Sequence, residues 1–257
     1  MVSDTQLSSD TLTPRRTARA REKLWTAPRA RLAASLMMAA VAACGPVEDK
    51  ARPPAPTPSP AALPSPAAVL STSPVVLFLG TSLTAGQGLD PEEAYPALIQ
   101  DKVDAAGLGY RVVNAGVGGD TSADALGRLD WLLRQRVDVL VVETGANDAL
   151  RGQDPAATRG NIRAILEKAR TYRPPPRLVL VGMEAPRNLG SDYVRRFHAV
   201  YPELARESGA VLVPFLLEGV AGVDSLNQAD GIHPTAAGHR KMAETVWRVL
   251  EPVLRQR

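Results

Sequence analysis

The sequence has 257 residues, of which 45% are hydrophobic and 22% are charged, and it contains a single cysteine. This composition is ordinary for a globular protein and excludes a chain dominated by disorder and a disulfide-stabilised scaffold. The formal charge is +3, but residues 1–31 hold seven basic and three acidic side chains, which leaves −1 for the rest of the chain. Because phosphate binding needs a basic face on the folded part, we expect no nucleic-acid partner.

An uncharged apolar run, residues 32–43, follows the basic stretch. It is shorter than the roughly 20 residues that span a bilayer, and it predicts the hydrophobic region of a signal peptide. The run ends in Val41-Ala42-Ala43-Cys44, which resembles the lipobox of bacterial lipoproteins. The resemblance implies a signal peptide over residues 1–43 and a lipid on Cys44 that anchors the exported protein to a membrane, facing the periplasm or cell exterior. The alternatives are an ordinary buried cysteine and simple cleavage at an Ala-x-Ala site.

Residues 44–74 are rich in proline and alanine, with nine prolines between Gly45 and Pro74. Proline removes backbone donors and favours polyproline II, so this stretch predicts an extended, semi-rigid linker. The folded unit is then residues 75–257, which is long enough to form one substantial core.

Apolar runs and helix-like segments alternate along residues 75–257. Five runs predict buried strands, at residues 75–79, 111–114, 137–142, 178–181 and 211–215. Five segments predict helices, at residues 95–106, 122–136, 155–172, 191–208 and 235–254. This alternation predicts an α/β fold, a three-layer α/β/α sandwich around a five-stranded parallel sheet.

Small and polar residues gather where these strands end, which is where ligands bind in such folds. Ser82 follows the first strand and is a candidate nucleophile. His233 has a carboxylate, Asp230, three residues earlier, and this spacing lets the carboxylate orient the imidazole while its other nitrogen faces Ser82. Gly119 offers a backbone N–H and Asn147 a side-chain amide for an oxyanion hole. Together these residues predict acyl transfer.

Four segments resemble, in order, the sequence blocks of the SGNH, or GDSL-type, serine esterase family. They are Gly80-Thr-Ser-Leu-Thr84, Gly118-Gly-Asp-Thr-Ser122, Gly145-Ala-Asn-Asp148 and Asp230-Gly-Ile-His-Pro234. The resemblance is closest to bacterial arylesterases, thioesterases and lysophospholipases and implies a flavodoxin-like sheet. It also implies Ser82 as nucleophile, His233 as base and then acid, Asp230 as its orienter, and the Ser82 N–H, Gly119 N–H and Asn147 amide as oxyanion hole. The family's first block usually has aspartate before the nucleophile, whereas this chain has Thr81.

Structural interpretations compete at several of these positions. Ser82 alone would cap a helix, and Asp230 alone would cap a turn. Asp230 and His233 would suit a metal, but the sequence shows no third ligand at a recognisable spacing, so we expect no metal and no organic cofactor. Asp148 is interpreted as an ordinary turn residue, and Glu143, at the end of the third strand, has no sequence-based account.

Three further features lie outside the four blocks. His198 and His239 fall in predicted helices and are interpreted as solvated or packed histidines. Residues 183–189 follow the fourth strand and are expected to form a flexible wall of the acyl pocket, the alternative being a plain connecting loop. The predicted function is hydrolysis of a small-molecule ester or thioester through an acyl-enzyme. The alternatives are a carbohydrate O-acetyl esterase and a non-catalytic lipoprotein that binds acyl groups or glycans.

Overall fold

The computed structural model describes residues 73–256 of the chain. The predicted signal peptide, the lipidated Cys44 and almost all of the predicted linker lie outside these described residues, and these expectations remain predictions. Within residues 73–256, no helix combines the length and the apolar character that crossing a bilayer requires.

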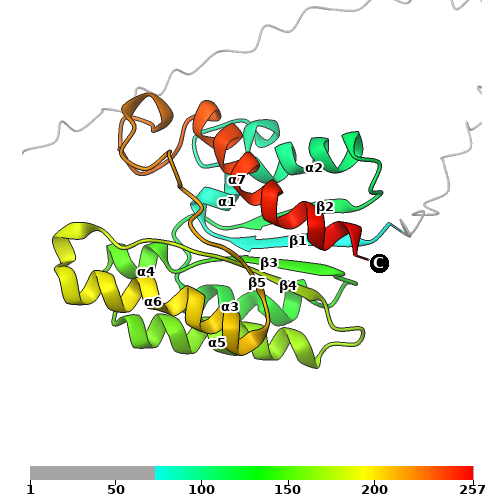
Figure 1. Cartoon of the computed structure of the whole chain (residues 1–257), viewed down its shortest axis with the longest axis horizontal. Helices are drawn as coiled ribbons and strands as arrows, with labels where there is room; N and C mark the ends of the chain where they lie inside the picture. Colours follow the sequence, from blue (N-terminus) through cyan, green and yellow to red (C-terminus); the bar gives the residue numbers. More distant parts are fainter. Residues whose placement is uncertain (1–72, 257) are drawn as a thin grey trace, which may run out of the picture. The chain divides into compact units, whose positions relative to one another are not determined.

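Five parallel strands form the central sheet (Figure 1), and their order is β2-β1-β3-β4-β5. They are β1 (Val75–Gly80), β2 (Arg111–Gly116), β3 (Val139–Glu143), β4 (Arg177–Val181) and β5 (Val211–Val213). This order is that of a flavodoxin-like, doubly wound sheet. The predicted fold class is therefore confirmed.

Helices cover both faces of the sheet, as Figure 1 shows. One face carries α1 (Ser82–Ala85), α2 (Tyr95–Ala105) and α7 (Ala236–Arg255), and the other carries α3 (Ser122–Leu132), α4 (Ala146–Leu150), α5 (Pro155–Thr171) and α6 (Ser191–Ser208). The structure also has three short 3₁₀ helices, at Pro91–Glu93, Arg187–Leu189 and Asp224–Leu226.

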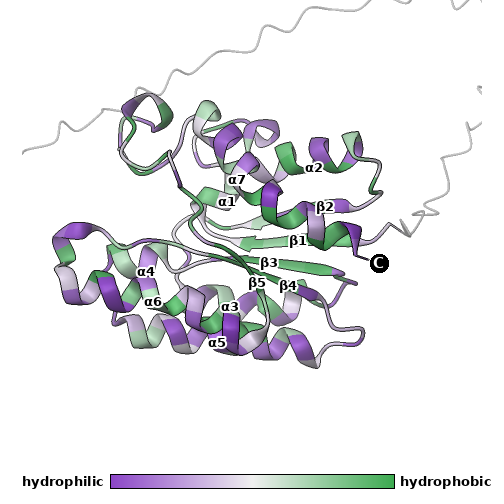
Figure 2. Cartoon of the chain, viewed as in Figure 1, coloured by the Kyte–Doolittle hydropathy of each residue, from purple (hydrophilic) through white to green (hydrophobic). Residues whose placement is uncertain are grey.

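The apolar sequences of the strands explain why the sheet lies buried between two layers of helices. Every residue of β1 and β3 is buried, as expected for strands that are covered on both faces. Figure 2 shows these strands as hydrophobic, whereas the helices alternate between apolar and polar residues. The core therefore lies on both sides of the sheet, with Phe78 and Leu140 among its largest fully buried side chains.

Four element ends lie two or more residues from their predicted positions, and two short helices were not predicted. Strand β2 ends at Gly116, two residues beyond the predicted end. Helix α3 ends at Leu132, not at residue 136, because the chain turns at residues 133–134 and bends at residue 135 before it enters the sheet. Strand β3 begins at Val139, two residues later than predicted. Strand β5 ends at Val213, since Pro214 has no N–H to continue the ladder. Helices α1 and α4 have at most five residues, too few to show a periodic pattern.

Candidate active site

Ser82 begins helix α1, directly after β1. Thr81 has extended backbone angles and caps the helix, since its side chain accepts a hydrogen bond from the Leu83 N–H. The short helix ends at Ala85 and is capped by Gly86, whose left-handed φ of 77° favours glycine. This sharp strand-to-helix turn carries the Ser82 hydroxyl at the carboxyl edge of the sheet.

His233 and Asp230 lie in the loop that precedes α7. Asp230 Oδ2 is 2.6 Å from His233 Nδ1, and Asp230 Oδ1 accepts the backbone N–H groups of Ile232 (2.9 Å) and His233 (3.0 Å). These hydrogen bonds hold the pKa of the Asp230 carboxyl far below its usual range, the His233 N–H having the largest effect. Because an ionised carboxylate only accepts, Nδ1 must carry the hydrogen.

The fold brings this pair to the serine. His233 Nε2 lies 3.0 Å from Ser82 Oγ, although 151 residues separate them in the sequence. With the hydrogen on Nδ1, Nε2 is left as the acceptor for the Ser82 hydroxyl. Gln228 anchors the histidine loop, because its side-chain amide donates to the Gln87 carbonyl (2.7 Å) just beyond α1 and to the Pro234 carbonyl (3.0 Å).

The predicted oxyanion donors Gly119 and Asn147 lie in the loop after β2 and in helix α4. Gly119 lies between β2 and α3 with a left-handed φ of 82°, and Arg151 donates to its carbonyl at 2.8 Å. Asn147 lies in α4 and donates one side-chain N–H to the Asp120 carbonyl at 2.9 Å. An amide nitrogen carries two hydrogens, so the second remains for another acceptor.

Arg128 was not singled out in the sequence, although it holds this edge of the sheet together. Its guanidinium donates to the Gly80 carbonyl (2.9 Å), to the Ala115 carbonyl (2.7 Å) and to the Asp120 carboxylate (2.7 Å). It therefore ties the ends of β1 and β2 to the Gly119 loop. Sequence alone could not separate this arginine from the other arginines in the predicted helices.

The interpretation of Asp148 as an ordinary turn residue was wrong. Its side chain is buried and accepts the Ser122 N–H (2.8 Å), the Ser122 hydroxyl (2.5 Å) and the Thr158 hydroxyl (3.2 Å). A buried carboxylate needs such partners. Asp148 therefore fastens α4, which carries Asn147, to the start of α3, close to the Gly119 loop.

The other two histidines have no contact with Ser82. His198 is largely exposed and lies 2.6 Å from the Glu184 carboxylate. His239 is buried in α7, and its Nδ1 accepts the Tyr95 backbone N–H at 3.1 Å. Their interpretation as solvated and packed residues therefore agrees with their positions.

His239 is expected to make folding pH-dependent. Burial, with a smaller contribution from the charge of His233, lowers the pKa of His239 from 6.5 to about 4. Between those values the unfolded chain binds the extra proton, so the free energy of unfolding falls as the pH drops, by about 3 kcal/mol in all. Chemical denaturation of wild type and His239→Asn from pH 4 to 8 measures this slope. Asparagine keeps an acceptor for Tyr95 but does not titrate, and equal slopes in both proteins would contradict the expectation.

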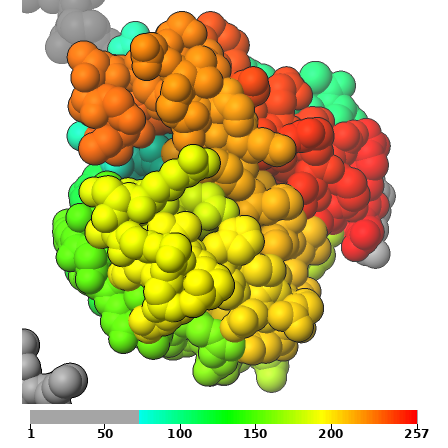
Figure 3. All heavy atoms as spheres, turned by 60° about the vertical axis from the view of Figure 1, so that its left-hand side comes forward, coloured from blue at the N-terminus to red at the C-terminus, as the bar shows by residue number. Residues whose placement is uncertain are grey.

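An apolar cavity of about 790 Å³ opens beside Ser82 and His233, and Asn147 also lines it. Gly119 is outside this lining. The apolar wall includes Leu150, Met183, Pro186, Val194, Phe215 and Leu217. Figure 3 shows this face hollowed between the orange loop after β5 and the yellow segment that follows β4. Residues 183–187 line the cavity, so the segment after β4 is part of its wall and not only a connection.

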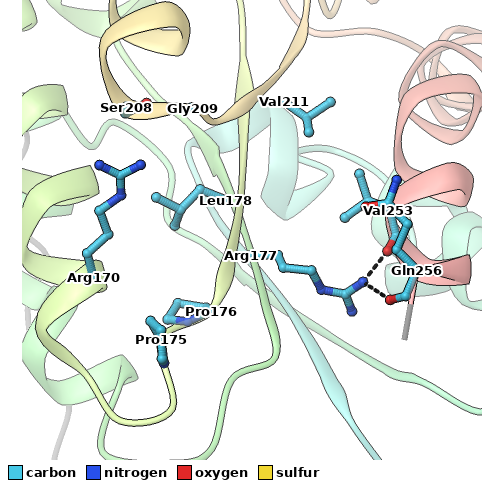
Figure 4. Close-up of a pocket in the computed structure, with 10 residues that line it drawn as sticks. All are labelled: Arg170, Pro175, Pro176, Arg177, Leu178, Ser208, Gly209, Val211, Val253 and Gln256. Carbon is cyan, nitrogen blue, oxygen red and sulfur yellow. Dashed lines mark hydrogen bonds between the residues drawn. The ribbon is translucent and has the colours of Figure 1, made fainter.

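A second hollow lies at the opposite edge of the sheet (Figure 4). There Arg177 donates hydrogen bonds to the carbonyls of Val253 and Gln256, and so fixes the end of α7 to the start of β4. The serine in its lining, Ser208, donates its hydroxyl to the Leu204 carbonyl within α6. The Arg177 and Ser208 side chains of this hollow are therefore used in hydrogen bonds within the fold.

Among residues 73–256, no three His, Cys, Asp or Glu side chains group in a way that would hold a metal ion.

A serine, a histidine and a carboxylate in hydrogen-bonded sequence are typical of serine hydrolases. The family model described as "GDSL-like Lipase/Acylhydrolase family" matches residues 78–241. The chain belongs to this family, and it is a carboxylic ester hydrolase, a serine esterase of the SGNH type.

Individual relatives agree with this assignment. The chain is 43% identical over 180 residues to "Esterase TesA" of Pseudomonas aeruginosa, covering 70% of this chain and 89% of that protein. It is 38% identical over 180 residues to "Thioesterase 1/protease 1/lysophospholipase L1" of Escherichia coli K12, covering 70% and 84%. The crystal structure of AlinE4, an SGNH-hydrolase family esterase, superposes with a TM-score of 0.59 at 42% identity, covering 71% of this chain and 97% of that one.

Proposed function

We propose that the chain hydrolyses acyl esters or thioesters with Ser82 as nucleophile, His233 as general base and then acid, and Asp230 as the residue that orients His233. The observation that carries this proposal is the continuous hydrogen-bonded path from Ser82 Oγ to His233 Nε2 (3.0 Å) and from His233 Nδ1 to Asp230 Oδ2 (2.6 Å). The path has the direction that deprotonation of the serine requires.

In the proposed mechanism, Ser82 Oγ attacks the substrate carbonyl while its proton passes to His233. The oxyanion receives hydrogen bonds from the Ser82 N–H, the Gly119 N–H and the second N–H of the Asn147 amide, whose first N–H is held by the Asp120 carbonyl. The tetrahedral intermediate collapses to the acyl-enzyme, and His233 returns the proton to the departing alcohol or thiol. Water, deprotonated by His233, then releases the acid and restores Ser82.

The lining of the cavity beside Ser82 is evidence that the cavity binds an acyl chain. Its wall is mainly aliphatic, with an aromatic ring at Phe215, and side chains of this kind bind apolar substrate groups. The E. coli relative is named a thioesterase and lysophospholipase, and both of these names denote release of an acyl group. We therefore favour fatty acyl esters and thioesters over acetylated glycans.

Activity is expected to rise with acyl length. Each methylene that the cavity buries contributes about 0.8 kcal/mol, so kcat/KM should increase up to about fourfold per methylene until the cavity is full. The measurement is hydrolysis of p-nitrophenyl esters from acetate to hexadecanoate, together with the matching acyl-CoA thioesters. Ser82→Ala serves as the control for background hydrolysis.

Two results would contradict this reading. A maximum at acetate, with faster release of acetate from an acetylated glycan, would favour the carbohydrate O-acetyl esterase. If the chain neither hydrolyses the panel nor forms a covalent adduct between Ser82 and a fluorophosphonate, it would be a binding lipoprotein. Mass spectrometry of the labelled peptide distinguishes these cases, because Ser82→Ala removes the attachment site.

We also propose that the enzyme is exported and anchored through a lipid on Cys44, which would hold it at a membrane facing the periplasm or the cell exterior. The support is the basic stretch, the apolar run and the cysteine that follows it. All three lie outside residues 73–256. Incorporation of labelled palmitate at Cys44 tests this proposal.

A further inference from the structure

Glu143 is a fully buried carboxylate directly behind the nucleophile. It ends β3, next to the end of β1, and its side chain accepts three kinds of donor from the Ser82 turn. The Thr81 N–H donates at 2.8 Å, the Thr81 hydroxyl lies 3.0 and 3.1 Å from the two carboxylate oxygens, and the Thr84 hydroxyl donates at 2.8 Å. Glu143 thus holds the turn by hydrogen bonds to residues on both sides of Ser82.

The surroundings of Glu143 are hydroxyl and amide groups within an apolar core. Burial raises the pKa of Glu143, while the hydrogen bonds from Thr81 and Thr84 act in the opposite direction. Two titratable groups face it from other elements, Tyr95 of α2, which lies 2.8 Å from the Thr84 hydroxyl, and Tyr201 of α6. Burial raises the pKa of both phenols, and the Glu143 charge raises it further. Both tyrosines therefore stay neutral.

Because Gly80 has no side chain, it leaves room for the Thr84 hydroxyl and the Glu143 carboxylate. A Cβ atom at Gly80 would lie 1.9 Å from the Thr84 hydroxyl oxygen and 2.9 Å from Glu143 Oε2. A side chain at the end of β1 would therefore displace the groups that meet behind Ser82. The turn, the glutamate and the glycine form one packed unit.

We propose that Glu143 is a positioning residue for Ser82, and that Thr81 is its matched hydroxyl donor. The inference rests on the proposed role of Ser82 as nucleophile. Glu143 has no hydrogen bond to Ser82 Oγ and does not itself line the cavity. It acts through Thr81, which does line the cavity, and through Thr84, and these two residues fix the backbone on either side of the serine. Misplacement of a nucleophile by about 1 Å is enough to slow a reaction by about 10²-fold.

The threonine at position 81 affects the charge that Glu143 can carry in this pair. A hydroxyl donates to a carboxylate without changing its charge, so Glu143 can accept all its donors while ionised. An aspartate at position 81 would bring a second carboxylate to a similar distance, and two carboxylates so close together cannot both ionise. One proton would then have to remain with the pair for the turn to keep its shape.

The test compares Glu143→Gln, Thr81→Val and Thr81→Ser with wild type. Glutamine keeps the shape of the side chain but mismatches its donors, and valine keeps the shape of threonine without the hydroxyl. We expect both variants to lower kcat for a p-nitrophenyl ester and the rate of fluorophosphonate labelling by 10- to 100-fold, with KM within about twofold. Thr81→Ser should stay within about threefold of wild type. Glu251→Gln, at a half-buried site on α7 where the carboxylate pairs with Arg255, is the matched control.

The pH profile separates positioning from a loss of folding. Thr81→Asp is expected to add an ionisation to the pH dependence of kcat, above which activity falls, and Thr81→Asp/Glu143→Gln should lack it. The proposal is overturned if Glu143→Gln and Thr81→Val both retain wild-type kcat, or if Thr81→Ser loses as much activity as Thr81→Val. It is also overturned if KM changes in place of kcat. Absence of hydrolysis by wild type would instead count against the proposed function.

Discussion

Replacing Ser82 with alanine is expected to lower kcat for a short-chain p-nitrophenyl ester by at least about 10³-fold, because no acyl-enzyme can form without the nucleophile. Folding should be unaffected, since the hydroxyl's hydrogen bond in the structure is to His233 Nε2 and not to the core. The measurement is steady-state hydrolysis, with the melting temperature of both proteins recorded in the same buffer.

A second serine provides the control for this experiment. Ser191→Ala removes an exposed hydroxyl at the start of α6 and should leave kcat and KM at wild-type values. If Ser82→Ala kept more than about a tenth of the activity, background hydrolysis having been subtracted, the role of Ser82 as nucleophile would have to be abandoned.

Replacing His233 with alanine is also expected to lower kcat by about 10³-fold or more. Without the imidazole, no group 3.0 Å from Ser82 Oγ accepts the proton, and none returns it to the leaving group. Asp230 would remain but would have no ring to orient. Labelling of Ser82 by a fluorophosphonate should slow in parallel, because this reaction needs the same deprotonation.

The two remaining histidines serve as comparisons for His233. His198→Ala, at an exposed position, should keep nearly full activity at neutral pH, and His239→Asn should act on stability more than on turnover. Equal losses in His198→Ala and His233→Ala would show that the imidazole paired with Asp230 has no special role.

Export and lipidation remain predictions, because they concern residues outside 73–256. Residues 1–31 account for the positive formal charge of the whole chain, and removal of the predicted leader before Cys44 would leave a formal charge of −1. The positive formal charge of the full sequence therefore gives no support for an acidic substrate.

Periodicity and local motifs were enough to predict the fold. Buried strands such as β1 and β3 are continuous apolar runs, and the polar segments that end them are visible in the sequence. Each of these signals is local, because it depends on neighbouring residues along one strand or helix. The four family blocks added the roles proposed for Ser82, Asn147, Asp230 and His233.

Long-range packing decided what the sequence could not. Three contacts join segments that are distant in the chain. His233 lies 3.0 Å from Ser82 across 151 residues, and Asp148 is buried against Ser122. Glu143 accepts hydrogen bonds from Thr81 and Thr84. A carboxylate is costly to bury unless donors surround it, and those donors come from other strands and helices. The sequence by itself determined the class of fold and the candidate chemistry, whereas the tertiary structure decided which carboxylates support the site.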